Sequence, residues 1–172
     1  MSQAEGIFAG GATKPYIEET YDIDGNLIDV KMHGYTKVRD FAFYDCYDLL
    51  LINLSDGIVS IGKSAFYGCT SLALTSLPAG VTSIGIGAFV GCTSLALTSI
   101  PAGIVSIGDG AFSGCTGITE LTFMGTPTSI ASGAFNGCEN LTTINVSWAE
   151  GAVANAPWGA TNATINYNYT GG

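Results

Sequence analysis

Five cysteines are the residues of this chain best suited to do chemistry, and they recur at a regular interval of 23 residues. These cysteines are Cys46, Cys69, Cys92, Cys115 and Cys138. A zinc site usually shows Cys or His in pairs at short spacing, such as C-x2-4-C, and the sequence has no such pair. An odd number of cysteines also argues against a complete disulfide framework. Because a free cysteine often packs as a small hydrophobic side chain, we expect inert core thiols, without a metal or a cofactor.

A catalytic role would need a second group beside one particular cysteine. His33 is the only histidine, and five equivalent cysteines leave it no preferred partner for a Cys–His pair. Serine is scattered through every copy of the repeat, so no Ser-His-Asp arrangement is indicated. The stretch from Asp22 to Asn26 lacks the D-x-[DN]-x-[DN]-G order of a calcium loop and is typical of a turn. We therefore predict that the protein is not an enzyme.

The charge of the chain excludes several classes of partner. Acidic residues number 14 against 5 basic ones, the net charge is −9, and no Lys or Arg follows Lys63. Nucleic-acid binding needs clustered Lys and Arg to release phosphate counterions, so no nucleic-acid partner is expected, and an anionic membrane surface is disfavoured too. No apolar run approaches the roughly 20 residues of a spanning helix, which argues against membrane insertion. The first residues show no signal peptide, because a charged segment followed by an apolar one is missing.

A second regular column accompanies the cysteines and defines a repeat. Each cysteine is preceded by a phenylalanine three positions earlier, and these residues are Phe43, Phe66, Phe89, Phe112 and Phe135. The unit reads I-G-x-x-A-F-x-G-C-x-x-L-x-x-L-x-L, and its L-x-L segment alternates as a β-strand does. A short fixed period of this kind is typical of a solenoid, in which each unit buries its apolar side chains against its neighbours. The Phe and Cys columns are therefore predicted to form the structural core.

These units resemble the leucine-rich repeat, and more closely the BspA-like variety of bacterial surface proteins. The resemblance rests on the segment from Ser60 to Cys69, SIGKSAFYGC, and on its three following copies. It implies a curved solenoid with a parallel sheet on one side and short strands, turns or helical pieces on the other. It also implies an extracellular, cell-surface or virion-associated location.

The ends of the chain depart from the repeat. We assign residues 1–14 to a flexible lead or linker, 15–37 to an N-terminal capping hairpin, 38–146 to five repeats, and 147–172 to a degenerate sixth repeat that acts as a C-terminal cap. The hairpin turn is predicted at Ile23-Asp24-Gly25-Asn26-Leu27, with Ile28, Val30 and Met32 facing the first repeat. In the cap, extending the preceding columns by one more repeat length puts Trp158 over the open end of the core, and Tyr167 and Tyr169 in the strand positions.

The strand segments carry the candidate binding residues. Small polar residues and one aligned leucine column occupy positions that simple alternation directs outward, and the possible binding face comprises Leu51, Asn53, Leu74, Ser76, Leu97, Ser99, Glu120 and Thr122. The leucines could form an exposed apolar stripe for a partner or for self-association. Alternatively, a local bulge turns Leu74 and Leu97 inward and their neighbours Thr75 and Thr98 outward.

From these features we expect a non-enzymatic recognition or adhesion module that binds a protein or a glycan through one face of the solenoid. The alternative is a structural or receptor-binding appendage of a phage or prophage tail. The Gly-rich lead without a signal peptide would suit that setting, as would the ending Ala156-Pro157-Trp158-Gly159.

Overall fold

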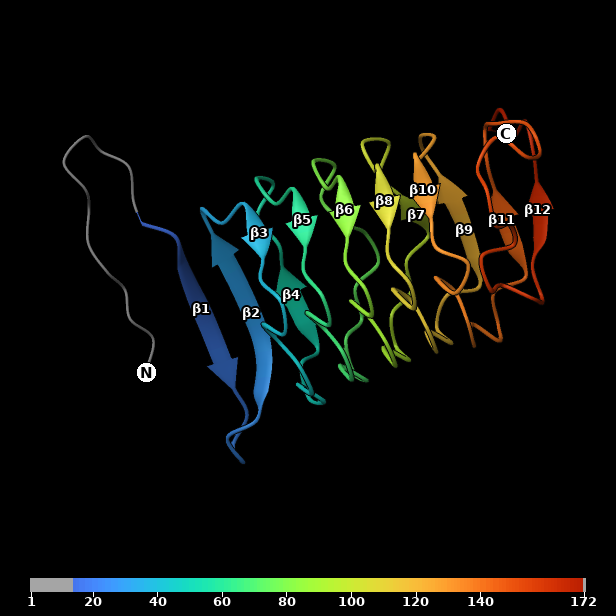
Figure 1. Cartoon of the computed structure of the whole chain (residues 1–172). Helices are drawn as coiled ribbons and strands as arrows, with labels where there is room; N and C mark the ends of the chain where they lie inside the picture. Colours follow the sequence, from blue (N-terminus) through green and yellow to red (C-terminus); the bar gives the residue numbers. More distant parts are fainter. Residues whose placement is uncertain (1–13, 172) are drawn as a thin grey trace.

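The structure, a computed structural model, describes residues 14–171 and consists of short strands wound into a parallel β-solenoid (Figure 1). Residues 1–13, which fall in the predicted linker, lie outside the described part. The strands are β1 (Tyr16–Tyr21), β2 (Leu27–His33), β3 (Lys37–Val38), β4 (Leu51–Asn53), β5 (Ser60–Ile61), β6 (Ser83–Ile84), β7 (Ser99–Ile100), β8 (Ser106–Ile107), β9 (Glu120–Phe123), β10 (Ser129–Ile130), β11 (Thr143–Asn145) and β12 (Thr164–Asn166). The solenoid predicted from the regular cysteine period is confirmed. Within residues 14–171 no helix is long and apolar enough to cross a bilayer.

One side of the solenoid is a five-stranded parallel sheet with the order β10-β8-β6-β5-β3. Equivalent residues of successive units pair in register, for example Ser60 with Ser83 and Ser83 with Ser106. In β5, β6 and β8 the inward isoleucine is buried, whereas the serine beside it stays partly exposed. Strand alternation thus places one apolar residue of each strand in the core, and these residues are Val38, Ile61, Ile84, Ile107 and Ile130.

The other side carries the L-x-L strands, and its sheet is interrupted. Strands β1, β2 and β4 form one sheet, and β7, β9, β11 and β12 form another. Residues 74–77, which would provide the strand between β4 and β7, adopt no strand conformation. This face is therefore divided at the second repeat.

The hairpin at the N-terminal end is β1 paired antiparallel with β2. Strand β2 also pairs in parallel with β4, with Val30 opposite Ile52, so the hairpin extends the L-x-L face by two strands. Val30 and Met32 are buried, as the alternation of this segment predicts, whereas Ile28 is only partly buried.

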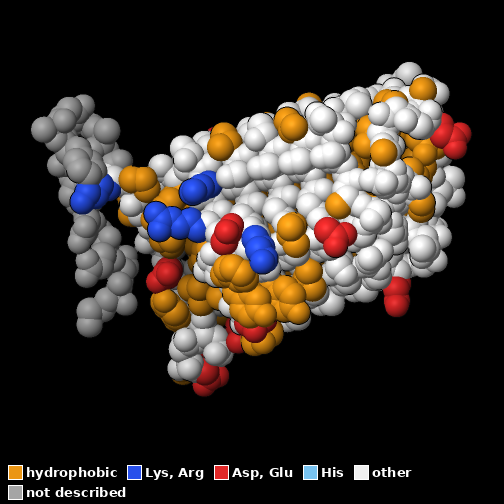
Figure 2. Space-filling model, viewed as in Figure 1, with side chains coloured by type: hydrophobic (Ala, Val, Ile, Leu, Met, Phe, Trp, Pro, Cys, Tyr) orange, Lys and Arg blue, Asp and Glu red, His pale blue; other side chains and the backbone are white. Residues whose placement is uncertain are grey.

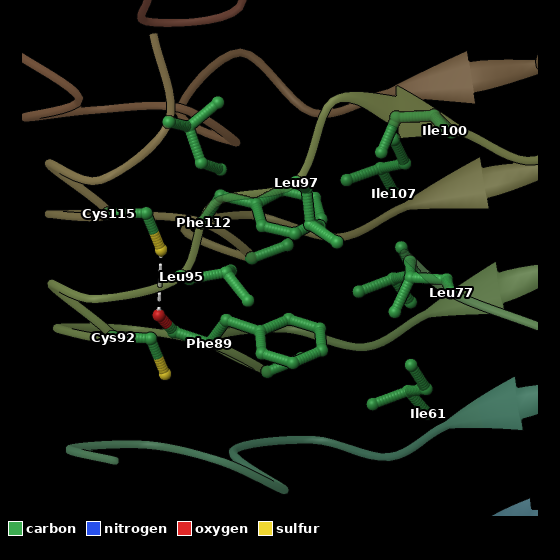
Figure 3. Close-up of a cluster of buried hydrophobic side chains, with 14 of the residues drawn as sticks. Ile61, Leu77, Phe89, Cys92, Leu95, Leu97, Ile100, Ile107, Phe112 and Cys115 are labelled. Atoms are coloured by element: carbon green, nitrogen blue, oxygen red, sulfur yellow. Dashed lines mark hydrogen bonds between the residues drawn. The ribbon is translucent and has the colours of Figure 1, made fainter. Parts of the chain in front are cut away.

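The core is built from stacked columns of identical side chains. The five phenylalanine rings lie nearly parallel, with 5.1–5.4 Å between successive ring centroids. Figure 3 shows Phe89 and Phe112 stacked in this way, with Leu95 and Leu97 beside them. Each inner ring of this column stacks between the rings of the turns before and after it. At an open end, the last ring would therefore expose its aromatic surface.

The last turn closes this end in a register different from the prediction. Ile165, not Tyr167, pairs with Ile144, so the last turn is two residues shorter than the repeat, and Tyr169 is exposed. The assignment of Tyr167 and Tyr169 to the strand positions was therefore wrong. Trp158 is fully buried, its indole Nε1 donates to the Ala154 carbonyl oxygen at 2.7 Å, and its ring packs near Trp148 and Phe123.

Candidate functional site

The cysteine column is a ladder of hydrogen bonds between turns. In the second to fifth repeats the thiol donates to a phenylalanine carbonyl oxygen of the preceding turn, at 3.0 Å. The pairs are Cys69 with Phe43, Cys92 with Phe66, Cys115 with Phe89, and Cys138 with Phe112. Figure 3 marks the bond of Cys115. The thiols therefore link neighbouring turns through the backbone.

The thiols of this ladder are held in the protonated form. Burial raises the pKa of Cys92 to about 12 and that of Cys138 to about 11, and it raises the pKa of Cys115 as well. A protonated thiol is neither a nucleophile nor a metal ligand. Cys46 begins the column and is only half-buried; its pKa is also raised, by burial and then by the carboxylate of Asp45.

His33 has partners other than cysteine. Its ring stacks on Tyr16 with centroids 4.4 Å apart, and its Nε2 lies 3.2 Å from a carboxylate oxygen of Glu18. Within residues 14–171 no group of three or more His, Cys, Asp or Glu side chains is placed to hold a metal ion. The hairpin thus uses its histidine in a surface cluster.

The structure separates the leucines of the expected apolar stripe. Leu51 is 58% exposed, Leu74 is partly buried, and Leu97 is only 1% exposed and belongs to the core. Thr75 and Thr98 are exposed instead. The alternative with a local bulge is therefore the one that the structure adopts, and Leu97 is removed from the possible binding face.

A slip in the backbone ladder explains this inversion. The Ala73 N–H donates to the Leu50 carbonyl oxygen, but the Ala96 N–H, at the equivalent position one repeat later, donates to Leu74 instead of Ala73. A slip of one residue directs the next side chain to the opposite face. Because burying a leucine is favourable by about 2 kcal/mol, the slipped register that turns Leu97 inward is preferred over alternation.

The polar residues of the strand face differ in how free they are. Asn53, Ser76 and Glu120 are exposed, whereas Ser99 and Thr122 are partly exposed. The Asn145 side-chain amide donates to Glu120 at 2.8 Å and to Thr122 at 3.2 Å, so the C-terminal part of this face is engaged in its own hydrogen bonds. Beside the interruption a groove of about 390 Å³ remains, and its lining includes Asn53, Leu74 and Ser76.

A cluster of aromatic side chains lies on the surface of the first two repeats and was not identified from the sequence. This aromatic patch consists of Phe41, Tyr44, Tyr47 and the partly exposed Tyr67. The rings of Tyr44 and Tyr67 stack with centroids 4.8 Å apart. The ring centroids of Phe41 and Tyr44 are 5.9 Å apart. Exposed fractions are 50% for Phe41, 44% for Tyr44 and 54% for Tyr47. Figure 2 shows the resulting hydrophobic area over the N-terminal turns.

The patch can offer both apolar surface and hydrogen bonds. A hydrogen bond to the Asp45 side chain raises the pKa of Tyr47, and loss of hydration raises the pKa of Tyr44. Both phenols are therefore neutral donors near pH 7. The tyrosines combine a broad apolar ring with a polar tip, as interface residues commonly do.

A departure from the repeat pattern was the signal for this patch. Phe41 is replaced by Ser or Gly in the later units, Tyr47 by Thr or Glu, and Tyr44 by Tyr67 once and then by Val, Ser and Asn. Averaging the copies into a consensus conceals such a difference. The aromatic residues at these repeat positions all lie in the first turns, and the solenoid brings them onto one surface.

Comparison with known proteins shows what these repeats are similar to. The BspA type leucine rich repeat region matches residues 36–150 in 6 copies. Among solved structures, a leucine-rich repeat protein from Bacteroides ovatus is 32% identical, with a TM-score of 0.60, over 69% of this chain and 31% of that one. A leucine rich cell surface protein from Faecalibacterium prausnitzii is 27% identical, with a TM-score of 0.67, over 80% of this chain and 39% of that one.

The pneumococcal vaccine antigen PcpA shares the fold at 16% identity, with a TM-score of 0.51, over 87% of this chain and 48% of that one. This chain thus spans less than half the length of these three proteins. No curated protein matches it. These matches give no support to the alternative of a phage tail appendage.

Proposed function

Because the chain belongs to the BspA-type leucine-rich repeat family, we propose that it is a non-enzymatic recognition module displayed at a bacterial cell surface. In this proposal the module binds a protein or a glycan, and the aromatic patch is the primary contact surface. The similarity to a cell surface protein of Faecalibacterium prausnitzii supports the location. We extend the same proposal to any longer protein that contains these repeats.

The observation that carries the proposal is the aromatic patch itself. Exposed apolar residues scattered singly are ordinary, but a contiguous cluster on a monomer surface often marks an interaction site. Tyrosine is enriched at such surfaces because it buries much area while losing little side-chain entropy. Phe41, Tyr44 and Tyr47 all come from one short segment of the first repeat, where later repeats have mostly small or polar residues.

A binding screen with patch variants tests this function. The chain is presented to a panel of extracellular matrix proteins and to a glycan array, and Tyr44→Ser with Tyr47→Ser is compared with the wild type. We expect affinity for the ligand to fall at least about tenfold, as for loss of central aromatic contacts, with an unchanged melting temperature. Met124→Ser is the matched control, because Met124 is also exposed but lies outside the patch.

The outcome of the screen can contradict the proposal in two ways. Absence of any ligand in both panels removes the recognition function. A ligand whose affinity is equally affected by the patch variant and by Met124→Ser removes the aromatic patch as its site.

The strand face is a second proposed surface for the same function. The groove beside residues 74–77 is lined by Asn53, Ser76 and the partly exposed Leu74, a mixture of polar and apolar groups that suits an extended ligand. Asn53→Lys with Ser76→Lys places two long side chains in this groove. Loss of binding in this variant but not in the patch variant would assign the ligand to the strand face.

A further inference from the structure

The few basic side chains of this acidic chain are concentrated in one place. Only five Lys and Arg residues occur in the chain, against 14 acidic residues. Three of them, Lys37, Arg39 and Lys63, line one open groove of about 570 Å³. Like charges repel one another, so three cations in one groove are electrostatically unfavourable. The carboxylates that could pair with them are abundant elsewhere in the chain.

Among the described residues, these three cations form no ion pair with a carboxylate. The ion pairs of this part of the chain join Lys31 and His33 to Glu18, and both belong to the hairpin. Asp40 also lines the groove, but its Oδ1 accepts the backbone N–H of Lys63 at 2.9 Å. The three basic residues of the groove are all exposed, so their charged groups are available to an anion from outside.

The groove is elongated and has hydrogen-bonding walls. It follows the five-stranded sheet from β3 across β5 and β6 to β8, and Ser60, Ser83 and Ser106 line it. Because these serines pair in register, their hydroxyls recur about every 4.8 Å. A repeated donor and acceptor row beside these cations suits an extended ligand that carries both hydroxyl and acidic groups.

The groove is continuous with the aromatic patch. The Lys63 Nζ lies 5.8 Å from the ring centroid of Phe41, and Arg39, Asp40 and Phe41 are consecutive in the chain. Figure 2 shows Lys and Arg side chains beside the hydrophobic area on the same face of the N-terminal turns. A ligand could therefore contact the cations and the aromatic rings together.

We propose that the ligand of this module is an acidic polysaccharide, which lies along the groove and the aromatic patch. This inference rests on the proposed recognition function. The cations would pair with carboxylate or sulfate groups of the ligand, and charge-assisted hydrogen bonds of this kind are stronger than neutral ones. The exposed tyrosine and phenylalanine rings would cover the apolar faces of the sugar rings, which leaves the sugar hydroxyls to the serine row.

The alternative polyanions fit these observations less well. Three cations neutralise too few phosphates for a nucleic acid, whose binding depends on many such contacts. An acidic peptide would use apolar side chains as well, and the groove offers serines and glycines where pockets for such side chains would be needed. A polysaccharide uses the shallow polar walls and the flat rings directly.

The test measures binding of the whole chain to immobilised polymers at low salt. Polygalacturonate supplies carboxylates, chondroitin sulfate supplies sulfates, and dextran is the neutral control. We expect binding to one or both acidic polymers and none to dextran, with an affinity that falls as salt is added. Arg39→Gln with Lys63→Gln is expected to lower the affinity at least about tenfold. The comparison of the two acidic polymers would assign carboxylate or sulfate as the preferred group.

A matched control separates this groove from general charge. Lys31→Gln removes one basic residue of the hairpin that already pairs with Glu18, and we expect it to leave the affinity unchanged. An equal loss in Lys31→Gln and in a single groove variant such as Lys63→Gln overturns the assignment to the groove. Thermal unfolding of each variant checks that its fold is retained.

The remaining outcomes distinguish the inference from the function on which it rests. If poly-glutamate binds as tightly as the acidic polysaccharides, the ligand is an acidic peptide and the inference is overturned. If no acidic polymer binds, but Tyr44→Ser with Tyr47→Ser abolishes binding to a protein of the matrix panel, the inference fails while the recognition function stands. If neither polymers nor panel members bind, both fail.

Discussion

Each buried thiol of the cysteine column touches a carbonyl oxygen of the preceding turn, and this contact gives the regular cysteine period a chemical reason. Alanine at the same position would leave a cavity and remove the donor, whereas a larger aliphatic side chain would need more space. Cysteine is small, largely apolar and able to donate weakly through its S–H group. The regular cysteines therefore connect neighbouring turns through hydrogen bonds.

Removing one thiol should have an effect that depends on pH. Cys92→Ala is expected to lower the free energy of unfolding by about 1–2 kcal/mol at pH 7, through the lost hydrogen bond and the cavity. The raised pKa of Cys92 makes its contribution complete below about pH 8.5, where the unfolded thiol is also protonated. As the pH rises toward about 12, this contribution is lost. The difference between wild type and variant should shrink above about pH 8.5, by up to about 1.4 kcal/mol per pH unit.

Urea unfolding at pH 7 and pH 10 measures this difference. Cys92→Ser is the control, since it keeps a donor but does not titrate in this range. A difference between wild type and Cys92→Ala that stays constant from pH 7 to pH 10 would show that burial does not hold the thiol proton.

At the scale of the elements, the two sides of the solenoid differ in regularity. The five-stranded sheet keeps its register through every turn, because a glycine follows each central strand and lets the turns approach closely. A Cβ on Gly85 would lie 2.7 Å from the backbone of Gly62 and Lys63. On the L-x-L side the ladder slips by one residue at Leu74, and Leu97 is buried.

A pair of glycine substitutions tests the close approach of the turns. Gly85→Ala is expected to cost about 1–3 kcal/mol, because the added methyl meets backbone that has little room to move. In Gly80→Ala the nearest atom would be 3.4 Å away, so stability should be unchanged or slightly higher. Thermal unfolding compares the two, and equal melting temperatures would contradict the packing argument.

Two leucine substitutions test the slipped register. Leu97→Asp places a carboxylate in the core and should cost at least about 3 kcal/mol. The same change at Leu51, which is more than half exposed, should alter stability by no more than about 0.5 kcal/mol. Chemical unfolding of both variants gives the comparison. A stable Leu97→Asp variant would mean that this side chain faces solvent.

At the scale of the whole molecule, the two ends of the solenoid differ from each other and from the turns between them. Acidic, basic and aromatic side chains gather in the first turns, whereas small neutral residues cover most of the later ones. In a solenoid each turn contacts only its neighbours, so stability is approximately a sum of local terms. The hairpin stabilises one end, and Trp158 with Trp148 and Phe123 covers the other.

Loss of the terminal tryptophan should therefore act locally. Trp158→Ala is expected to lower stability by about 3–5 kcal/mol, with the largest gain in hydrogen exchange in β11 and β12. Protection in β5 and β6 should fall later, because several turns lie between them and the substitution. Trp158→Phe, which keeps an aromatic ring but loses the indole donor, should be intermediate. A uniform rise in exchange along the chain would contradict local stabilisation.

The sequence by itself determined the solenoid, its Phe and Cys core columns and the position of the N-terminal hairpin. A strict period defines which residues stack, since each residue must meet its equivalent in the next repeat, and no long-range information beyond the period is needed. The sequence could not determine features that depend on a shift of one or two residues, because the side-chain direction in a strand reverses with every single step. The direction of Leu97 and the register of the last turn are of this kind.

Only the tertiary structure decided where the non-repeating residues meet. The aromatic patch joins Phe41, Tyr44 and Tyr47 to Tyr67, and the groove joins Lys37 and Arg39 to Lys63, in each case across neighbouring turns. These residues are outside the consensus, so the repeat pattern carries no information about them. Their proximity follows from stacking of the turns, which brings residues about one repeat length apart into contact and gives a regular scaffold its irregular surface.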